Sequence, residues 1–241
     1  MAVEVRRDFH DELDEVRDDI VRTAGLVTEA LARATRAFLD GDLSVAEEII
    51  DGDDEIDDLT LKVEEHCYQL LALQQPMASD LRALTTAIRL SAEIERSGDL
   101  VTNIMKGARR IYGIELPPKI RGMIESLSEQ VHRLFRLAID SYVDHNVGLA
   151  SALDDMDDEV DELHVDYIES IFETHESGTI PLQAAVQLAL IGRFYERIGD
   201  HAVNIGERVR YLCTGWLPEH TGAARHAARR AAEQERHWEG T

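Results

Sequence analysis

The chain has 241 residues, of which 44% are hydrophobic, so it can bury a sizeable core as one large domain or two small ones. Its 48 acidic and 25 basic residues give a formal net charge of −23, which argues against binding to nucleic acid or anionic lipid, because both need a concentrated cationic surface. Only three basic residues are lysines, and this acidic, lysine-poor balance indicates a halophile, whose cytosolic salt screens repulsion between like charges.

The N-terminal segment lacks the apolar stretch of a signal peptide, and no run approaches the roughly 20 apolar residues needed to cross a bilayer. We therefore expect a cytoplasmic protein. The two cysteines, Cys67 and Cys213, fall in different segments without the spacing of a zinc ribbon or a redox pair. We expect both to be buried, reduced thiols.

Apolar residues recur at helical spacing almost throughout, and glycine, proline and short polar residues interrupt the pattern. The breaks fall at residues 39–42, 74–76, 112–118, 144–146, 175–181 and 214–218. The sequence therefore predicts an all-α fold with six long helices. The second helix is expected to start at Ser44, since Glu47 follows it at capping-box spacing.

The second half of the chain repeats the first. The stretch "IERSGDLVTNIMK" (94–106) matches "YERIGDHAVNIGE" (195–207) at six of thirteen positions, with an offset of 101 residues. Similarly, "DDEIDDL" (53–59) resembles "DDEVDEL" (157–163) with an offset of 104. The repeat predicts two related bundles of three helices each.

We place the first three-helix bundle at residues 1–114, the second at 119–213, and a C-terminal tail or short extra helix at 214–241. Each half has its own apolar seam at helical spacing. We therefore expect each bundle to have its own core, joined near Pro117 and Pro118.

Each copy of the repeated motif aligns a glutamate, an aspartate and an asparagine four residues apart, so the three side chains share one face of a helix. These residues are Glu95, Asp99 and Asn103 in the first copy and Glu196, Asp200 and Asn204 in the second. Relative to the apolar seam, this face points outward. Oxygen ligands without cysteine suit hard cations, so the sequence predicts metal sites here, with iron or manganese favoured and magnesium as a weakly retained alternative.

Outward carboxylates at this spacing are also typical of a solvated acidic surface, so a purely structural helical adaptor without metal is the alternative. The duplicated glycines, Gly98 and Gly199, favour a site. Each costs about 1 kcal/mol relative to alanine inside a helix, which indicates that something approaches both helices closely at this position.

Two carboxylates per helix do not complete a coordination shell, so a neighbouring helix, waters or an anion would have to supply the rest. Asp140 and Asp144 in the second bundle have the same spacing and are further candidates. The acidic stretches at 53–58 and 157–161 could also contribute, although the pattern favours a solvated helix start. His201, inside the motif, is expected to be a surface residue rather than a ligand.

The two copies of Glu-Arg-x-Gly-Asp-xxx-Asn-Ile, the stretch "GDDEIDDL" and "QQPMASDLR" (74–82) together resemble the PhoU family over about residues 6–213. The resemblance implies a cytoplasmic negative regulator of phosphate uptake that acts on the ATPase subunit of a phosphate ABC transporter and, where one exists, on a phosphate-sensing histidine kinase. It also implies clusters of iron, zinc or other metals held by Glu/Asp-xxx-Asp motifs, which fall here on Glu95 with Asp99 and on Glu196 with Asp200, and it implies pairing into homodimers. Ser97 departs from the family pattern, which commonly has an apolar residue at the position of Ile198.

We expect no enzymatic activity. The rival hypothesis is a carboxylate-bridged di-metal oxidoreductase, which would need inward-facing glutamates and paired Glu-x-x-His motifs. Here that motif occurs once, from Glu129 to His132. The sequence shows no nucleophile constellation and no glycine-rich phosphate loop.

Overall fold

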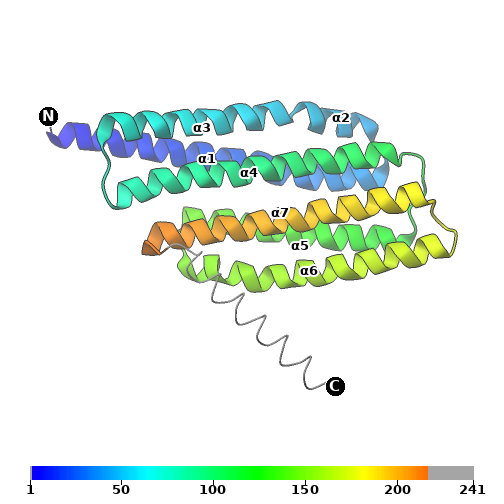
Figure 1. The fold of residues 1–241 in the computed structure, drawn as a ribbon. Helices are drawn as coiled ribbons and strands as arrows, with labels where there is room; N and C mark the ends of the chain where they lie inside the picture. The colour runs from blue at the N-terminus through cyan, green and yellow to red at the C-terminus, as the bar shows by residue number, and fades with distance from the viewer. Residues whose placement is uncertain (1, 217–241) are drawn as a thin grey trace, which may run out of the picture.

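The computed structural model describes residues 2–216, with side chains placed from residue 9 onward, and all regular structure in that range is α-helical. Figure 1 shows the helices as long rods lying side by side. Their bounds are α1 (Ala2–Asp40), α2 (Leu43–Asp51), α3 (Asp53–Gln74), α4 (Ser79–Arg110), α5 (Pro118–Val143), α6 (Val147–Glu176) and α7 (Leu182–Thr214). The predicted all-α fold class is confirmed.

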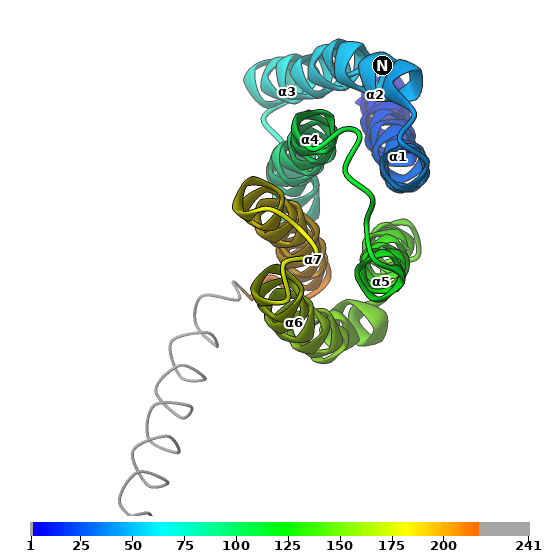
Figure 2. The same ribbon diagram turned by 90° about the vertical axis from the view of Figure 1, so that its right-hand side faces the viewer.

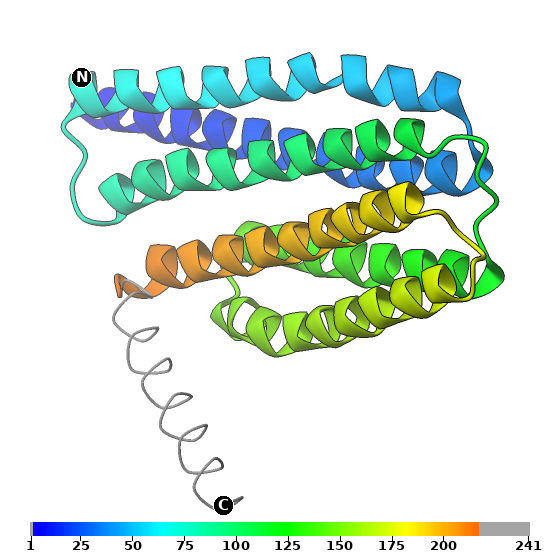
Figure 3. The same ribbon diagram turned by 45° about the vertical axis from the view of Figure 1, so that its right-hand side comes forward.

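Helices α2 and α3 form one interrupted rod, because only Gly52 separates them and its backbone remains in the right-handed helical region. The first half of the chain therefore contributes the rods α1, α2–α3 and α4, and the second contributes α5, α6 and α7 (Figures 1 and 3). This arrangement confirms two repeated three-helix units with six long rods.

The second rod begins earlier than expected. Asp42 is the N-cap of α2, and its carboxylate accepts hydrogen bonds from the backbone N–H groups of Ser44 at 3.0 Å and Val45 at 3.1 Å. A carboxylate that accepts these bonds satisfies amide groups with no partner inside the helix. The predicted capping box at Ser44 is therefore wrong.

The hydrophobic core is continuous across the two halves, so the expectation of a separate core in each bundle is wrong. Buried apolar side chains of all seven described helices belong to one cluster. In the end-on view of Figure 2, α4 lies over α7 and α1 lies over α5, and both pairs are in contact. Each of these helices therefore buries surface against the other half as well as against its own.

Specific contacts explain how closely the halves approach. A Cβ atom added to Gly107 of α4 would lie 3.0 Å from Cγ1 of Ile191 on α7. The glycine, which has no side chain, therefore allows the two helices to pack closely at this point. The hydroxyl of Thr35 on α1 forms 2.7 Å hydrogen bonds with the hydroxyls of Ser128 on α5 and Tyr195 on α7. All three residues are buried, so this polar network lies inside the shared core.

A hydrogen-bonded contact between a histidine and a carboxylate also crosses between the halves. Nδ1 of His201 on α7 lies 2.6 Å from Oε2 of Glu93 on α4, and Asn204 donates a 3.0 Å hydrogen bond to the same oxygen. Burial alone would raise the pKa of Glu93, but the hydrogen bonds from His201 and Asn204 outweigh it and the pKa is lowered. His201 is only 7% exposed, so the expectation that it is a surface residue is wrong.

Both cysteines are free, as predicted, but only Cys67 is buried, so the expectation of a buried thiol is wrong for Cys213. Cys67 is fully buried on α3, and burial raises the pKa of its thiol to about 12. Cys213 is half-buried, and its thiol lies 3.5 Å from the carbonyl oxygen of His145.

Within the described residues, no helix is both long and apolar enough to cross a membrane. Most of the predicted C-terminal tail, residues 217–241, lies outside the described residues.

Candidate metal centres

In the first half, the acidic start of α3 faces the predicted ligands on α4. Burial is the main factor that raises the pKa of Asp53, Asp57 and Glu95, and the negative charge of Asp99 adds to it in each case. Such mutual repulsion requires the four carboxylates to lie near one another across the two helices. We call these four residues the α3–α4 cluster.

The second half repeats this arrangement on α6 and α7. Burial raises the pKa of Asp157 to about 7, and repulsion from Asp161, Asp200 and Glu196 contributes. The pKa of Glu196 rises to about 6, again through burial first and then through Asp200, although Arg193 forms an ion pair with this carboxylate. We call Asp157, Asp161, Glu196 and Asp200 the α6–α7 cluster. It is the more buried of the two and has the more strongly raised pKa values.

Buried polar atoms without a protein partner gather at the α6–α7 cluster, and one occurs at a matching position of the first repeat. In the α6–α7 cluster they are Oδ1 of Asp157 and Oε2 of Glu196, together with Nε2 of the neighbouring His164. Thr60 takes the position of His164 in the first repeat, at the offset of 104 residues, and its hydroxyl is likewise buried without a partner. Unpaired buried polar atoms are costly, so these positions are suited to a bound cation or water.

The motif glycines make room for the facing helix. A Cβ atom on Gly199 would lie 2.5 Å from Oδ1 of Asp157, which is closer than real Cβ contacts. On Gly98 it would lie 3.2 Å from Cδ1 of Ile56 and 3.6 Å from Oδ1 of Asp53. The predicted close approach at both glycines is confirmed, and the approaching group is the preceding helix of the same repeat.

The outward orientation predicted for the motif holds only in part. Asp99 and Asp200 are exposed, but Glu95 is half-buried and Glu196 is only 8% exposed. Glu196 follows the fully buried Tyr195 directly, and α6 packs against this side of α7. The face therefore lies at the boundary between two helices rather than on the open surface.

The other predicted ligands do not join the two clusters equally. Asn103 is half-buried beside the α3–α4 cluster, whereas Asn204 donates its hydrogen bond to Glu93 on α4. Asp140 lines a groove between α1 and α5 with Arg36 and His132, and Asp144 caps the end of α5. The structure thus places these two aspartates on a different helix from the α6–α7 cluster.

Asp53, Asp57, Asp157 and Asp161, which the sequence favours as solvated helix starts, lie beside the motif carboxylates, and His164, which the sequence did not single out, lies next to the α6–α7 cluster. The available signal was the repeat itself, because the acidic stretch and the Glu-xxx-Asp motif recur together in both halves. The carboxylate oxygens of the α3–α4 and α6–α7 clusters do not converge on one point in this structure. Among the described residues, a different group, Glu12, Glu15 and His66, brings its three ligand atoms within 4.8 Å of one another. A cation at either cluster would therefore have to pull its carboxylates inward.

Comparison with known proteins identifies the family. The model of the PhoU domain matches residues 9–108 and 124–209, which corresponds to the two repeats. The chain belongs to the PhoU family. Among curated relatives, it is 34% identical over 215 residues to the "Phosphate-specific transport system accessory protein PhoU homolog 2" of Mycobacterium tuberculosis, covering 89% of this chain and all of that one. The homologue from Rhizobium meliloti is 30% identical over 211 residues, covering 88% of this chain and 89% of that one.

Solved PhoU structures share the fold. The crystal structure of PhoU from Pseudomonas aeruginosa superposes with a TM-score of 0.82 at 27% identity, covering 86% of this chain and all of that one. The PhoU structure from Streptococcus pneumoniae gives a TM-score of 0.80 at 25% identity, covering 87% of this chain and 98% of that one. The shared core of α1–α7 is therefore that of a PhoU protein.

Proposed function

We propose that this PhoU protein is a cytoplasmic, non-catalytic regulator that restrains phosphate uptake by acting on a phosphate ABC transporter, and that it binds metal at two acidic clusters. The observation that carries the proposal is the repeated arrangement of two facing acidic motifs, one in each PhoU repeat. Its relatives are named as accessory proteins of a phosphate-specific transport system, which supports the regulatory role.

The donor set of each cluster suits a hard or borderline cation. Asp53, Asp57, Glu95 and Asp99 would hold it in the first repeat, and Asn103 could add a carbonyl oxygen. In the second, Asp157, Asp161, Glu196 and Asp200 would do so, with His164 available at the edge. Iron or manganese is favoured over zinc and magnesium. A bound cation would supply positive charge that offsets the carboxylate repulsion and ties α3 to α4 and α6 to α7.

The long helical body suits an adaptor role. Helix faces can receive partner helices through apolar side chains, and exposed apolar residues occur on the outer rods of both repeats. They include Leu61 and Tyr68 on α3, and Val165 and Phe172 on α6, which stand at the same offset of 104 residues. We propose the ATPase subunit of the transporter as a partner and a phosphate-sensing histidine kinase as a second one where the organism has it.

A clean deletion tests the regulatory role. Loss of the protein is expected to increase phosphate uptake and expression of phosphate-starvation genes in phosphate-replete medium. Complementation with the wild-type gene should restore repression, which serves as the control. Unchanged uptake and expression in the deletion strain would contradict the role.

We also propose that the protein forms a homodimer. Light scattering of the purified protein in high salt measures its oligomeric state.

A helical adaptor that carries no metal is the second candidate. It is favoured by the spacing of the carboxylates, since neither cluster brings three ligand atoms within 4.8 Å in the described residues. Its acidic surface would then serve solubility in salt. Metal analysis of protein purified without a chelator or a histidine tag separates the two candidates.

A further inference from the structure

A row of polar contacts joins α1 to α3. Moving toward the N-terminus of α1, Arg22 contacts Glu55 at 3.3 Å and Asp19 contacts Lys62 at 2.7 Å. Each of these contacts pairs one carboxylate with one permanent cation. Their charges therefore balance.

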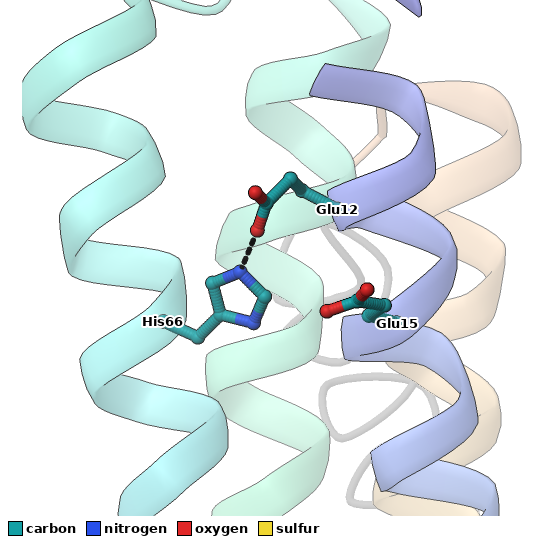
Figure 4. A group of neighbouring side chains, drawn as sticks. All are labelled: Glu12, Glu15 and His66. Carbon is teal, nitrogen blue, oxygen red and sulfur yellow. Dashed lines mark hydrogen bonds and ion pairs between the residues drawn. The ribbon is translucent and has the colours of Figure 1, made fainter. Parts of the chain in front are cut away.

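In the next contact of the row, the charges of the side chains do not balance. Nε2 of His66 on α3 lies 2.5 Å from Oε2 of Glu12 on α1, and the carboxylate of Glu15 lies on the same side of α1 (Figure 4). Glu15 forms no hydrogen bond or ion pair with the residues whose side chains are described. An imidazolium can offset at most one of the two carboxylates, so this contact has an excess of negative charge.

The three side chains also converge geometrically. One ligand atom from each of Glu12, Glu15 and His66 lies within 4.8 Å of the other two, which no other group of three or more such side chains achieves among the described residues. Glu12 and Glu15 are one helical turn apart on α1, and His66 approaches them from α3 (Figure 4). Its side chain is only 16% exposed, so packing between the helices limits its movement.

We propose that Glu12, Glu15 and His66 form a binding site for a divalent transition-metal ion that fastens α1 to α3. One imidazole nitrogen and two carboxylates are a donor set suited to zinc and other divalent first-row transition metals, whereas calcium and magnesium prefer oxygen ligands alone. A divalent cation neutralises the two carboxylates, which the imidazole cannot do. Glu12 and Glu15 are exposed, so the remaining coordination positions open to water.

This site is separate from the α3–α4 and α6–α7 clusters and does not depend on the proposed function. It uses a histidine where the clusters have carboxylates at their centre, and it lies between α1 and α3. The exposed acids Asp11, Asp14 and Glu65, which are sequence neighbours of the three ligands, raise the local concentration of cations.

Zinc titration of the full-length, chelator-stripped protein tests the proposal. To remove competing ligands, all proteins carry Glu95→Gln, Asp99→Asn, Glu196→Gln and Asp200→Asn. In this background, isothermal titration calorimetry is expected to show one zinc ion that His66→Ala abolishes and Glu15→Gln weakens at least about tenfold, because each removes one of three protein ligands. Glu15→Gln leaves the Glu12–His66 contact intact, so a change in folding does not account for its effect.

Glu65→Gln is the matched control, because it removes the same charge from an exposed position beside His66. It should leave the stoichiometry unchanged and the affinity within about twofold. Imidazole resonances of His66 in NMR spectra should shift on addition of one equivalent of zinc. The proposal is overturned if the background protein binds no zinc, if His66→Ala binds it equally well, or if Glu15→Gln and Glu65→Gln have the same effect.

Discussion

Replacing Asp157 with asparagine is expected to stabilise the metal-free protein. The carboxyl group is held among Asp161, Asp200 and Glu196, and Oδ1 is buried without a hydrogen-bond partner. Asparagine has nearly the same shape as aspartate and carries no charge. It therefore removes the repulsion without adding a heavy atom to the narrow space beside Gly199.

The magnitude follows from the pKa of Asp157, which rises from its ordinary value of 3.8 to about 7. A shift of about three units corresponds to a ceiling of about 4 kcal/mol. Solvent screening and coupling among the four carboxylates reduce this value, and we expect about 1–2 kcal/mol. For a chain of this size, that gain raises the melting temperature by about 2–8 °C.

The effect should depend on pH with a definite sign. Because the pKa of Asp157 is higher in the folded than in the unfolded chain, the folded state favours the protonated carboxyl. Wild type therefore loses stability relative to the asparagine variant as the pH rises from about 4 to about 7. The advantage of Asp157→Asn should be full at pH 8 and small near pH 4.

Urea unfolding followed by circular dichroism, with chelator present and ionic strength held constant, measures this difference. Asp155→Asn is the control, since Asp155 is exposed on the same helix and should change stability by less than about 0.5 kcal/mol. Adding iron(II) or manganese(II) should stabilise wild type more than the Asp157 variant, which has lost a ligand. An Asp157→Asn protein that is no more stable than wild type at pH 8, or equally more stable at pH 4 and pH 8, would refute the electrostatic reasoning.

Three further predictions concern the packing between helices. Gly206→Ala should lower the free energy of unfolding by about 1–3 kcal/mol, because the new Cβ would lie 2.6 Å from Cδ1 of Leu153 and 2.9 Å from the carbonyl oxygen of Ala150. Gly25→Ala is the control, since its Cβ would meet nothing within 4 Å, and it should raise that free energy by about 0.5–1 kcal/mol. Equal effects of the two variants in urea unfolding would contradict this. Tyr195→Phe should cost about 1–2 kcal/mol in the same assay by removing the buried hydrogen bond to Thr35. An unchanged midpoint would show that this bond adds no stability. Glu93→Gln should destabilise by about 1–2 kcal/mol at pH 7, and because the pKa of Glu93 is lowered in the folded chain, the difference should fade as the pH drops below about 4. A difference that persists at pH 3 would rule out the negative charge of Glu93 as its cause.

Helical periodicity was enough to predict the rods, because an apolar residue at every third or fourth position records which side of a helix is buried. It could not show that Gly52 interrupts the second rod, since Gly52 stays in helical conformation and lies inside a continuous periodic pattern. Nor could it show that α4 and α7 pack against each other. Their seams look alike whether the partner is a helix of the same repeat or of the other.

The candidate site illustrates the same limit. The sequence places Glu196 and Asp200 on one helical face, but the degree of burial depends on α6, which covers Glu196 and leaves Asp200 exposed. The tight space at Gly199 could be inferred from the stability cost of the glycine. That Asp157 is the side chain occupying it could not, because the contact depends on the register between two helices.

The metal content of the purified protein tests the central claim most directly. Wild type expressed without a histidine tag, purified without chelator and analysed by inductively coupled plasma mass spectrometry should contain iron or manganese. The bound metal should be lost in a variant with Glu95→Ala, Asp99→Ala, Glu196→Ala and Asp200→Ala whose circular dichroism spectrum shows that it is folded. A His66→Ala protein should retain the metal. Wild type without bound metal, and without an anomalous peak beside these carboxylates in metal-soaked crystals, would contradict the claim that the repeated acidic clusters are metal centres.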